Sequence, residues 1–200
     1  MKTALIVVDV QNDFCQDGTL AVPSANDIVP IVNSLMHDVL TFDVVVATQD
    51  LHPKDHGSFA KSKEELFSMK ELSGLPQVMW PAHCVEGTKG ADFHKGINPE
   101  LFDKVFPKGT DKNIDSYSGF FDNGKKKSTG MGEWLKEQGV THVYVVGLAL
   151  DYCVKATAVD AKAFGFETVV IERATKAVNM NPNDGQAALK EMQEKGIIIE

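Results

Sequence analysis

Three side chains that could together carry out nucleophilic catalysis follow separate apolar stretches of this sequence: Asp9, Lys108 and Cys153. A cysteine nucleophile needs a group that takes its proton and a cation that stabilises the resulting charge. Asp9 could be that base, and Lys108 that cation. Cys153 is expected to open a helix, where the helix dipole and free backbone N–H groups favour its thiolate. For this residue alone, a buried and inert cysteine is the alternative.

Two histidines and an aspartate form a candidate metal site. Asp50 and His52 stand two residues apart, and His83 lies in the segment Trp-Pro-Ala-His-Cys. Three such ligands leave coordination positions for water and substrate, as catalytic metal sites do. His56 is a fourth candidate, either as a ligand or as part of the pocket wall. A satisfied polar residue is the alternative for any one histidine.

Several other motifs are absent or incomplete. His52 and His56 stand four residues apart, but a metalloprotease helix needs Glu directly after the first His, and Pro53 stands there. The sequence contains neither the G-x-S-x-G serine elbow nor the G-x-G-x-x-G dinucleotide fingerprint. Phe14, Trp80 and Tyr117 lie in polar loops and could enclose a flat aromatic ligand, although ordinary packing also explains them.

The apolar spacing predicts strands that alternate with helices. Strands are expected at 3–8, 42–48, 103–106, 143–147, 168–171 and 197–199. Helices are expected at 28–40, with Asp27 as N-cap, and at 131–139, 153–164 and 184–195. Residues 53–100 are expected to be largely irregular, and a loop of that length is usually functional.

This order of elements indicates an α/β fold, a three-layer α/β/α sandwich around a mainly parallel, six-stranded sheet. Ligands of such sheets bind outside the carboxyl ends of the strands. Asp9, Asp50, Lys108 and Cys153 each follow a different predicted strand or its end. One rim of the sheet should therefore gather all four residues.

Composition limits the remaining possibilities. The 200 residues, 43% of them hydrophobic, suffice for one domain spanning 1–200. A net charge of −8 argues against a nucleic-acid partner, and the basic run Lys125–Lys127 is too short to change this. The apolar start ends at Asp9 without forming a signal peptide, and no stretch has membrane-spanning length. Three cysteines, an odd number, suggest free thiols in the cytoplasm.

Seven motifs, in order, resemble the isochorismatase-like hydrolases and, among them, the nicotinamidases. They run from near Thr3 to the C-terminal region and include Asp9-Val-Gln-Asn-Asp-Phe14, Asp50-Leu-His-Pro53, His56-Gly-Ser-Phe59, Trp80-Pro-Ala-His-Cys-Val85, Lys108-Gly109, Asp115-Ser-Tyr-Ser118 and Gly147-Leu-Ala-Leu-Asp-Tyr-Cys-Val154. Leu150 departs from the threonine that many relatives carry, which affects local hydrogen bonding but not the nucleophile.

The resemblance implies roles for individual residues. Asp9, Lys108 and Cys153 would form a catalytic triad, and Asp50, His52 and His83 would bind one divalent metal ion, zinc before iron or manganese. A cis peptide between Leu148 and Ala149 would aim the N–H groups of Ala149 and Cys153 as an oxyanion hole. The substrate pocket would include Phe14, Leu20, His56, Trp80 and Tyr117.

The implied reaction is hydrolysis of nicotinamide to nicotinate and ammonia through a thioester, a step of NAD salvage, with pyrazinamide as a further substrate. Two alternatives stay open on the sequence: a hydrolase of the same fold acting on isochorismate or a carbamoyl compound, and a catalytically silent α/β binding module. The metal ligands argue against the first, because those relatives generally lack them. The sequence leaves the oligomeric state open, from monomer to homo-oligomer.

Overall fold

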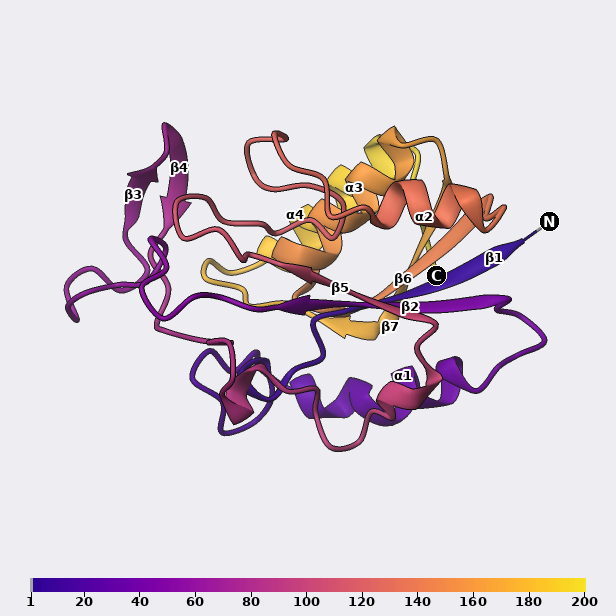
Figure 1. Ribbon diagram of the computed structural model, residues 1–200, viewed down its shortest axis with the longest axis horizontal. Coiled ribbons are helices and arrows are strands. Elements are labelled where there is room, and N and C mark those ends of the chain that lie inside the picture. Colours follow the sequence, from indigo (N-terminus) through magenta and orange to yellow (C-terminus); the bar gives the residue numbers. More distant parts are fainter. Residues whose placement is uncertain (1) are drawn as a thin grey trace.

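A twisted sheet of six parallel strands forms the centre of the computed structural model, which describes residues 2–200 (Figure 1). The strands lie in the order β5-β2-β1-β6-β7-β8, and every neighbouring pair is parallel. Their bounds are β1 Thr3–Val8, β2 Val44–Asp50, β5 Lys104–Lys108, β6 His142–Leu148, β7 Glu167–Lys176 and β8 Ile198–Ile199. This confirms the predicted six-stranded parallel sheet.

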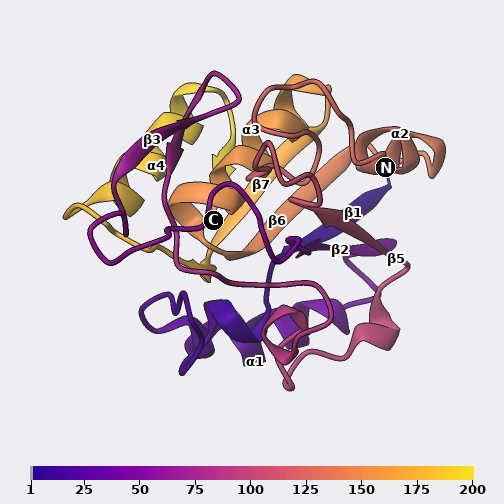
Figure 2. The same ribbon diagram turned by 60° about the vertical axis from the view of Figure 1, so that its left-hand side comes forward.

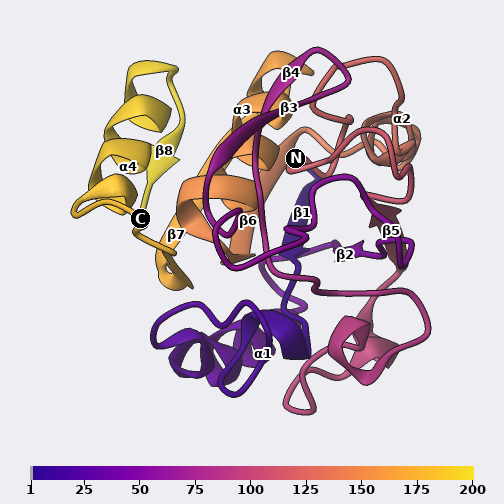
Figure 3. The same cartoon turned by 90° about the vertical axis from the view of Figure 1, so that its left-hand side faces the viewer.

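Helices cover both faces of the sheet. Helix α1 (Val29–Met36) lies on one face, together with short 3-10 turns at Lys89–Ala91 and Pro99–Leu101 (Figures 1 and 3). Helices α2 (Met131–Glu137), α3 (Lys155–Ala163) and α4 (Asp184–Glu194) cover the other face, as the turned view in Figure 2 shows. The three-layer α/β/α sandwich expected from the sequence is confirmed.

Strand β1 shows why the sheet stays central. All six of its residues are buried, and the five apolar ones alternate between two hydrophobic clusters. Ala4, Ile6 and Val8 pack toward α2, α3 and α4, whereas Leu5 and Val7 pack toward α1. A strand buried on both faces is an unbroken apolar run, which is how the sequence indicated it.

The first predicted helix is too long at both ends. Residues Ala25–Ile28 form a 3-10 turn, so Asp27 is not the N-cap, and α1 ends at Met36. The Asp38 carboxylate then accepts a hydrogen bond from the Thr41 backbone N–H at 3.2 Å, and this local turn replaces another helical turn. Val39 and Leu40 are consequently exposed, although their spacing suggested a buried helical face.

Residues 53–100 contain a hairpin that the sequence analysis did not predict. Strand β3 (Met69–Leu72) pairs antiparallel with β4 (Leu75–Val78), and the hairpin projects from the main sheet (Figure 1). Ser73 and Gly74 connect the strands with φ angles of 54° and 81°, as a two-residue hairpin turn requires. The Ser-Gly pair was the available signal for it.

The chain around Cys153 differs from the prediction in one respect. Cys153 does not open a regular helix but lies in a π-helical turn, Leu150–Val154, which leads into α3. The peptide bond between Leu148 and Ala149 is cis, as the resemblance implied. Among residues 2–200, no helix is both long enough and apolar enough to span a bilayer.

Candidate active site

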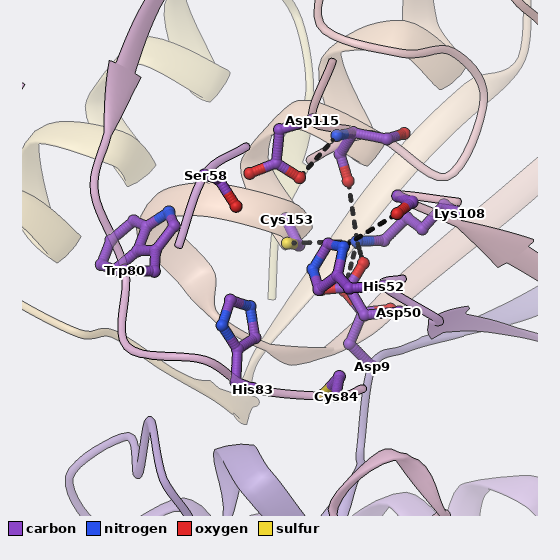
Figure 4. A network of polar contacts seen from close by, with 12 residues as sticks. Asp9, Asp50, His52, Ser58, Trp80, His83, Cys84, Lys108, Asp115 and Cys153 are labelled. Atoms are coloured by element: carbon purple, nitrogen blue, oxygen red, sulfur yellow. Dashed lines mark hydrogen bonds and ion pairs between the residues drawn. The ribbon is translucent and has the colours of Figure 1, made fainter. Parts of the chain in front are cut away.

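The predicted rim exists, and Lys108 lies at its centre. In the register of β2 and β5, Asp50 and Lys108 are direct partners at the carboxyl ends of both strands. The buried Lys108 Nζ lies 2.8 Å from Asp9 Oδ2, 2.5 Å from Asp50 Oδ1 and 3.5 Å from Cys153 Sγ (Figure 4). We call Asp9, Lys108 and Cys153 the sheet-end trio. Parallel strand ends therefore bring together residues separated by up to 144 positions.

Asp9 is buried as a potential base. Asp9 has a left-handed φ of 49°, and the chain turns there, directly after the end of β1. Burial raises the pKa of Asp9 to about 6, against the opposing effect of the Lys108 ammonium. The Thr48 hydroxyl donates a hydrogen bond of 2.6 Å to Asp9 Oδ1. Asp9 is thus a stronger base than an exposed aspartate while it remains held in place.

The electrostatics of Cys153 differ from the sequence-based expectation of a favoured thiolate. Burial raises the pKa of the Cys153 thiol well above its ordinary value, and the adjacent Lys108 offsets only part of this rise. The sequence argument credited a helix N-terminus, but Cys153 is buried inside the π-helical turn. The site therefore pairs a neutral thiol with a nearby carboxylate that can accept its proton.

Asp50, His52 and His83 form a candidate metal site, which we call the metal-ligand group. One potential ligand atom from each lies within 4.8 Å of the others, and all three residues are buried. His52 Nδ1 donates to the Gly109 carbonyl at 2.8 Å, and His83 Nδ1 donates to the Pro81 carbonyl at 2.7 Å. A carbonyl oxygen can only accept, so each neutral ring keeps its Nε2 lone pair free.

The charge of this group also suits a cation. Burial alone would lower the pKa of His52, but the Asp50 carboxylate raises it to about 9. Burial and the neighbouring His52 lower the pKa of His83 to about 4. The Asp50 carboxylate therefore stabilises a positive charge on His52, while the His83 imidazole stays neutral. A divalent metal ion can supply positive charge in place of the His52 proton. These donor types and fixed ring orientations fit a three-ligand zinc-type site.

His56 has the opposite ring arrangement. Its Nδ1 accepts a hydrogen bond of 3.2 Å from the Ser58 backbone N–H, and the Ser58 hydroxyl lies 2.7 Å from the same nitrogen. A backbone N–H can only donate, so the neutral ring carries its proton on Nε2. That nitrogen is buried without a hydrogen-bond partner in the part of the chain described. This arrangement makes His56 a donor beside His52, and with His52 and Asp115 it also forms a second group whose potential ligand atoms lie within 4.8 Å of one another.

The metal-ligand group depends on loop contacts that the sequence analysis did not identify. The buried Gln11 side chain donates to the Asp50 carbonyl and accepts from the Asp50 N–H, both at 2.8 Å. Asp13 Oδ2 accepts from the Cys84 N–H at 2.8 Å and so holds the segment that carries His83. Both residues belong to the Asp9–Phe14 motif, which was the available signal.

Gly109 is required where the loop meets His52. Its φ of 65° is left-handed, and a Cβ at this position would lie 2.4 Å from His52 Cε1. Only a glycine lets the backbone approach closely enough for its carbonyl to accept from His52 Nδ1. Gly109 follows Lys108 directly, so one dipeptide serves both the sheet-end trio and the metal-ligand group.

A pocket opens beside both groups, with about 410 Å³ of empty space when its open mouth is included. Of the predicted pocket residues, Phe14, Leu20, Trp80 and Tyr117 line it, together with Ala149 and Cys153, whereas His56 does not. The sequence analysis missed four further lining residues: Val22, Asp115, Tyr152 and Val178. Asp115 lies in a quoted motif, and Tyr152 is next to Cys153, so only Val22 and Val178 gave no signal.

Aromatic side chains give the pocket its flat walls. Trp80 Nε1 donates to the Tyr117 hydroxyl at 3.2 Å, and the Tyr152 ring packs edge-on against Trp80 with centroids 5.0 Å apart. Within residues 2–200, the lining includes no lysine or arginine. Lys108 lies behind the pocket, where two carboxylates compensate it. The pocket therefore favours a flat, uncharged ligand.

Comparisons with known proteins agree with this geometry. Residues 3–200 match the isochorismatase domain family. The chain is 42% identical to a nicotinamidase of Escherichia coli, covering 98% of this chain and 93% of that protein. It superimposes with a TM-score of 0.93 on a nicotinamidase and pyrazinamidase of Acinetobacter baumanii, at 42% identity over 99% of this chain and 95% of the other. For a Pyrococcus horikoshii pyrazinamidase in complex with zinc, the TM-score is 0.80 at 37% identity, covering 100% of this chain and 99% of that one.

Proposed function

Because the chain belongs to the isochorismatase family, we propose that its site hydrolyses nicotinamide to nicotinate and ammonia. The carrying observation is the contact of Lys108 with Asp9, Asp50 and Cys153 beside the metal-ligand group. This arrangement supports a nucleophile in the lining of one aromatic-walled pocket, with a base and a cation behind it. A neutral, flat ring with an amide substituent fits that combination.

In the first half of the reaction, Asp9 accepts the proton of the Cys153 thiol as the sulfur attacks the carboxamide carbon. Lys108 stabilises the negative charge on both groups. The N–H groups of Ala149 and Cys153 hold the oxyanion that forms, in the role the family resemblance implies. The C–N bond then breaks, and Asp9 returns its proton to the departing ammonia. A thioester between Cys153 and the ring acyl group remains.

In the second half, Asp9 takes a proton from water as that water attacks the thioester carbon. The carbon–sulfur bond breaks, Cys153 recovers its proton from Asp9, and the nicotinic acid that forms releases its own proton to solvent as nicotinate. Asp50, His52 and His83 would hold the metal ion, which we propose to be zinc. When bound, the ion would orient the substrate through its ring nitrogen and act as a Lewis acid.

We extend the proposal in three respects. Pyrazinamide should also be hydrolysed, since it presents the same carboxamide on a flat nitrogen-containing ring. Residues 1–200 should form one domain, because residues 3–200 match a single domain family. The protein should act in the cytoplasm, where its three free cysteines would stay reduced.

The alternative substrates of this fold are less compatible with the pocket. Isochorismate carries two carboxylates, and their recognition normally uses basic side chains. Among the described residues, the pocket lining contains no lysine or arginine but does contain Asp50 and Asp115. We therefore do not favour isochorismate.

The test measures consumption of nicotinamide, pyrazinamide, isochorismate and a carbamoyl amino acid by the zinc-loaded protein, with ammonia as a second readout. We expect ammonia from nicotinamide and pyrazinamide, and no turnover of isochorismate. Metal content is measured in the same preparation. Turnover of isochorismate without release of ammonia from nicotinamide would contradict the proposal.

A further inference from the structure

The pocket contains one carboxylate that the proposed mechanism does not use. Asp115 lines the pocket with only 4% of its surface exposed, and it comes from the loop between β5 and α2. In Figure 4 its carboxylate extends toward the space between Ser58 and Cys153. Asp50 also lines the pocket, but Lys108 compensates its charge. Among the described side chains, no lysine or arginine forms an ion pair with Asp115.

Hydrogen bonds from neutral donors hold Asp115 in this position, and potential ligand atoms of His52 and His56 lie within 4.8 Å of its carboxylate. Its Oδ1 accepts from the Ser116 backbone N–H at 2.8 Å, and its Oδ2 accepts from Gln77 Nε2 at 3.1 Å. Gln77 is itself buried and also donates to the Tyr117 hydroxyl at 3.2 Å. Both oxygens of the carboxylate thus accept hydrogen bonds that hold it in the pocket. It presents a negative charge in surroundings where screening by water is weak.

The proposed reaction changes the charge of the ligand in the pocket that Asp115 and Cys153 both line. The amide is neutral when it enters, and hydrolysis leaves a carboxylate on the same ring. A fixed negative charge in the pocket has little effect on the neutral substrate, but it raises the free energy of the bound anion. The same charge opposes ring acids that resemble the substrate.

We propose that Asp115 is a specificity-determining residue that admits uncharged ring amides and repels ring carboxylates, and that it thereby accelerates release of the acidic product. The proposal rests on the proposed nicotinamidase function. It assigns Asp115 no part in the chemical steps and no part in holding the metal ion.

The test compares binding of the two ligands that differ in this charge. In a zinc-loaded Cys153→Ala background, where no turnover occurs, nicotinamide and nicotinate are titrated calorimetrically with and without Asp115→Asn. We expect nicotinate to bind about ten-fold more tightly after the substitution, while nicotinamide affinity stays nearly constant. With Cys153 intact, nicotinate should inhibit the Asp115→Asn enzyme more strongly by a similar factor.

Asp122→Asn is the matched control. Asp122 is a buried carboxylate on the same loop, accepts hydrogen bonds from the Lys126 and Lys127 N–H groups, and does not line the pocket. Its substitution should leave the ratio of the two affinities unchanged. If Asp115→Asn does not fold, Asp115→Ser removes the same charge and keeps an acceptor for Gln77.

The possible results test the role of Asp115 and the proposed function separately. An unchanged ratio of nicotinate to nicotinamide affinity in Asp115→Asn would overturn the inference and leave the proposed function intact. Loss of zinc from Asp115→Asn would also overturn it, because Asp115 would then belong to the metal site. If the Cys153→Ala protein with Asp115 intact binds neither ligand, the proposed function itself is wrong.

Discussion

The sheet-end trio and the metal-ligand group lie side by side but are held in different ways. Asp9 and Lys108 are placed by backbone pairing of β1, β2 and β5, which are buried in the centre of the fold. His83 lies far along the segment after β2 and depends on single contacts such as the Asp13 carboxylate on Cys84 N–H. The first arrangement is a property of the sheet. The second can be lost by one local change while the sheet persists.

The largest expected effect is loss of catalysis at the sheet-end trio with no change in the metal-ligand group. Cys153→Ala should lower kcat by at least about 10⁴-fold, because Cys153 is the only cysteine among the described residues that lines the pocket. The metal-ligand group should be unaffected, so zinc content and nicotinamide binding should match the wild type. Ammonia release and metal analysis measure the two halves. Wild-type ammonia release by this variant would exclude a thioester mechanism.

Removing the metal ion tests the converse case, in which the metal-ligand group loses its function and the sheet-end trio stays intact. Treatment with a chelator should lower kcat/KM for nicotinamide by at least about 100-fold, since substrate orientation is lost. The sheet-end trio should persist, so the metal-free protein should still unfold in one cooperative transition, at a lower Tm. Re-added zinc should restore activity. Full activity of a demonstrably metal-free protein would show that the trio works alone.

Gly109→Ala sharpens the comparison at the residue where both groups meet. The added Cβ would collide with His52, so the ring must move away from the Gly109 carbonyl. We expect zinc affinity to fall about 10- to 100-fold, as for other lost contacts that orient a ligand. High zinc concentrations should then recover much of the activity, because Lys108 still lies between its carboxylates. An unchanged zinc Kd would mean that this contact does not orient His52.

The smallest expected effect is the pH dependence of kcat/KM, which follows the protonation of Asp9 in the sheet-end trio. Burial raises the pKa of Asp9 to about 6, so this carboxylate is ionised above that pH and protonated below it. Only the ionised form can accept the Cys153 proton, and kcat/KM should therefore fall about ten-fold per pH unit below 6. Measurements must use protein whose zinc content is verified at each pH. A profile that is flat down to pH 5 would argue against Asp9 as the base.

The same contrast explains what could be predicted from the sequence. Asp9, Asp50, Lys108 and Cys153 follow apolar runs, and parallel topology requires that such strand ends share an edge. The α/β/α fold follows from the same pattern. His83 carries no such signal, because no periodicity relates its loop to the sheet, and the prediction rested on residue type and family resemblance.

Other features could not be read from residue types. The tautomers of His52 and His56 depend on whether a carbonyl or an N–H faces Nδ1, and only the folded backbone determines this. The neutral thiol of Cys153 reflects its burial, which the expected helix start did not reveal. Val22 and Val178 enter the pocket from distant segments without any polar or aromatic mark.

The bond between Lys108 and Asp50 has a consequence for how the chain finds its native pairing. Strand β5 is an outer strand with only β2 beside it, so its alignment is less constrained than that of an inner strand. A shift by one residue would turn Lys108 to the opposite face and leave both carboxylates without their counter-ion. The ion pairs of Lys108 with the two carboxylates therefore also destabilise a misaligned β5. The correct strand register and the proposed catalysis depend on the same buried ammonium.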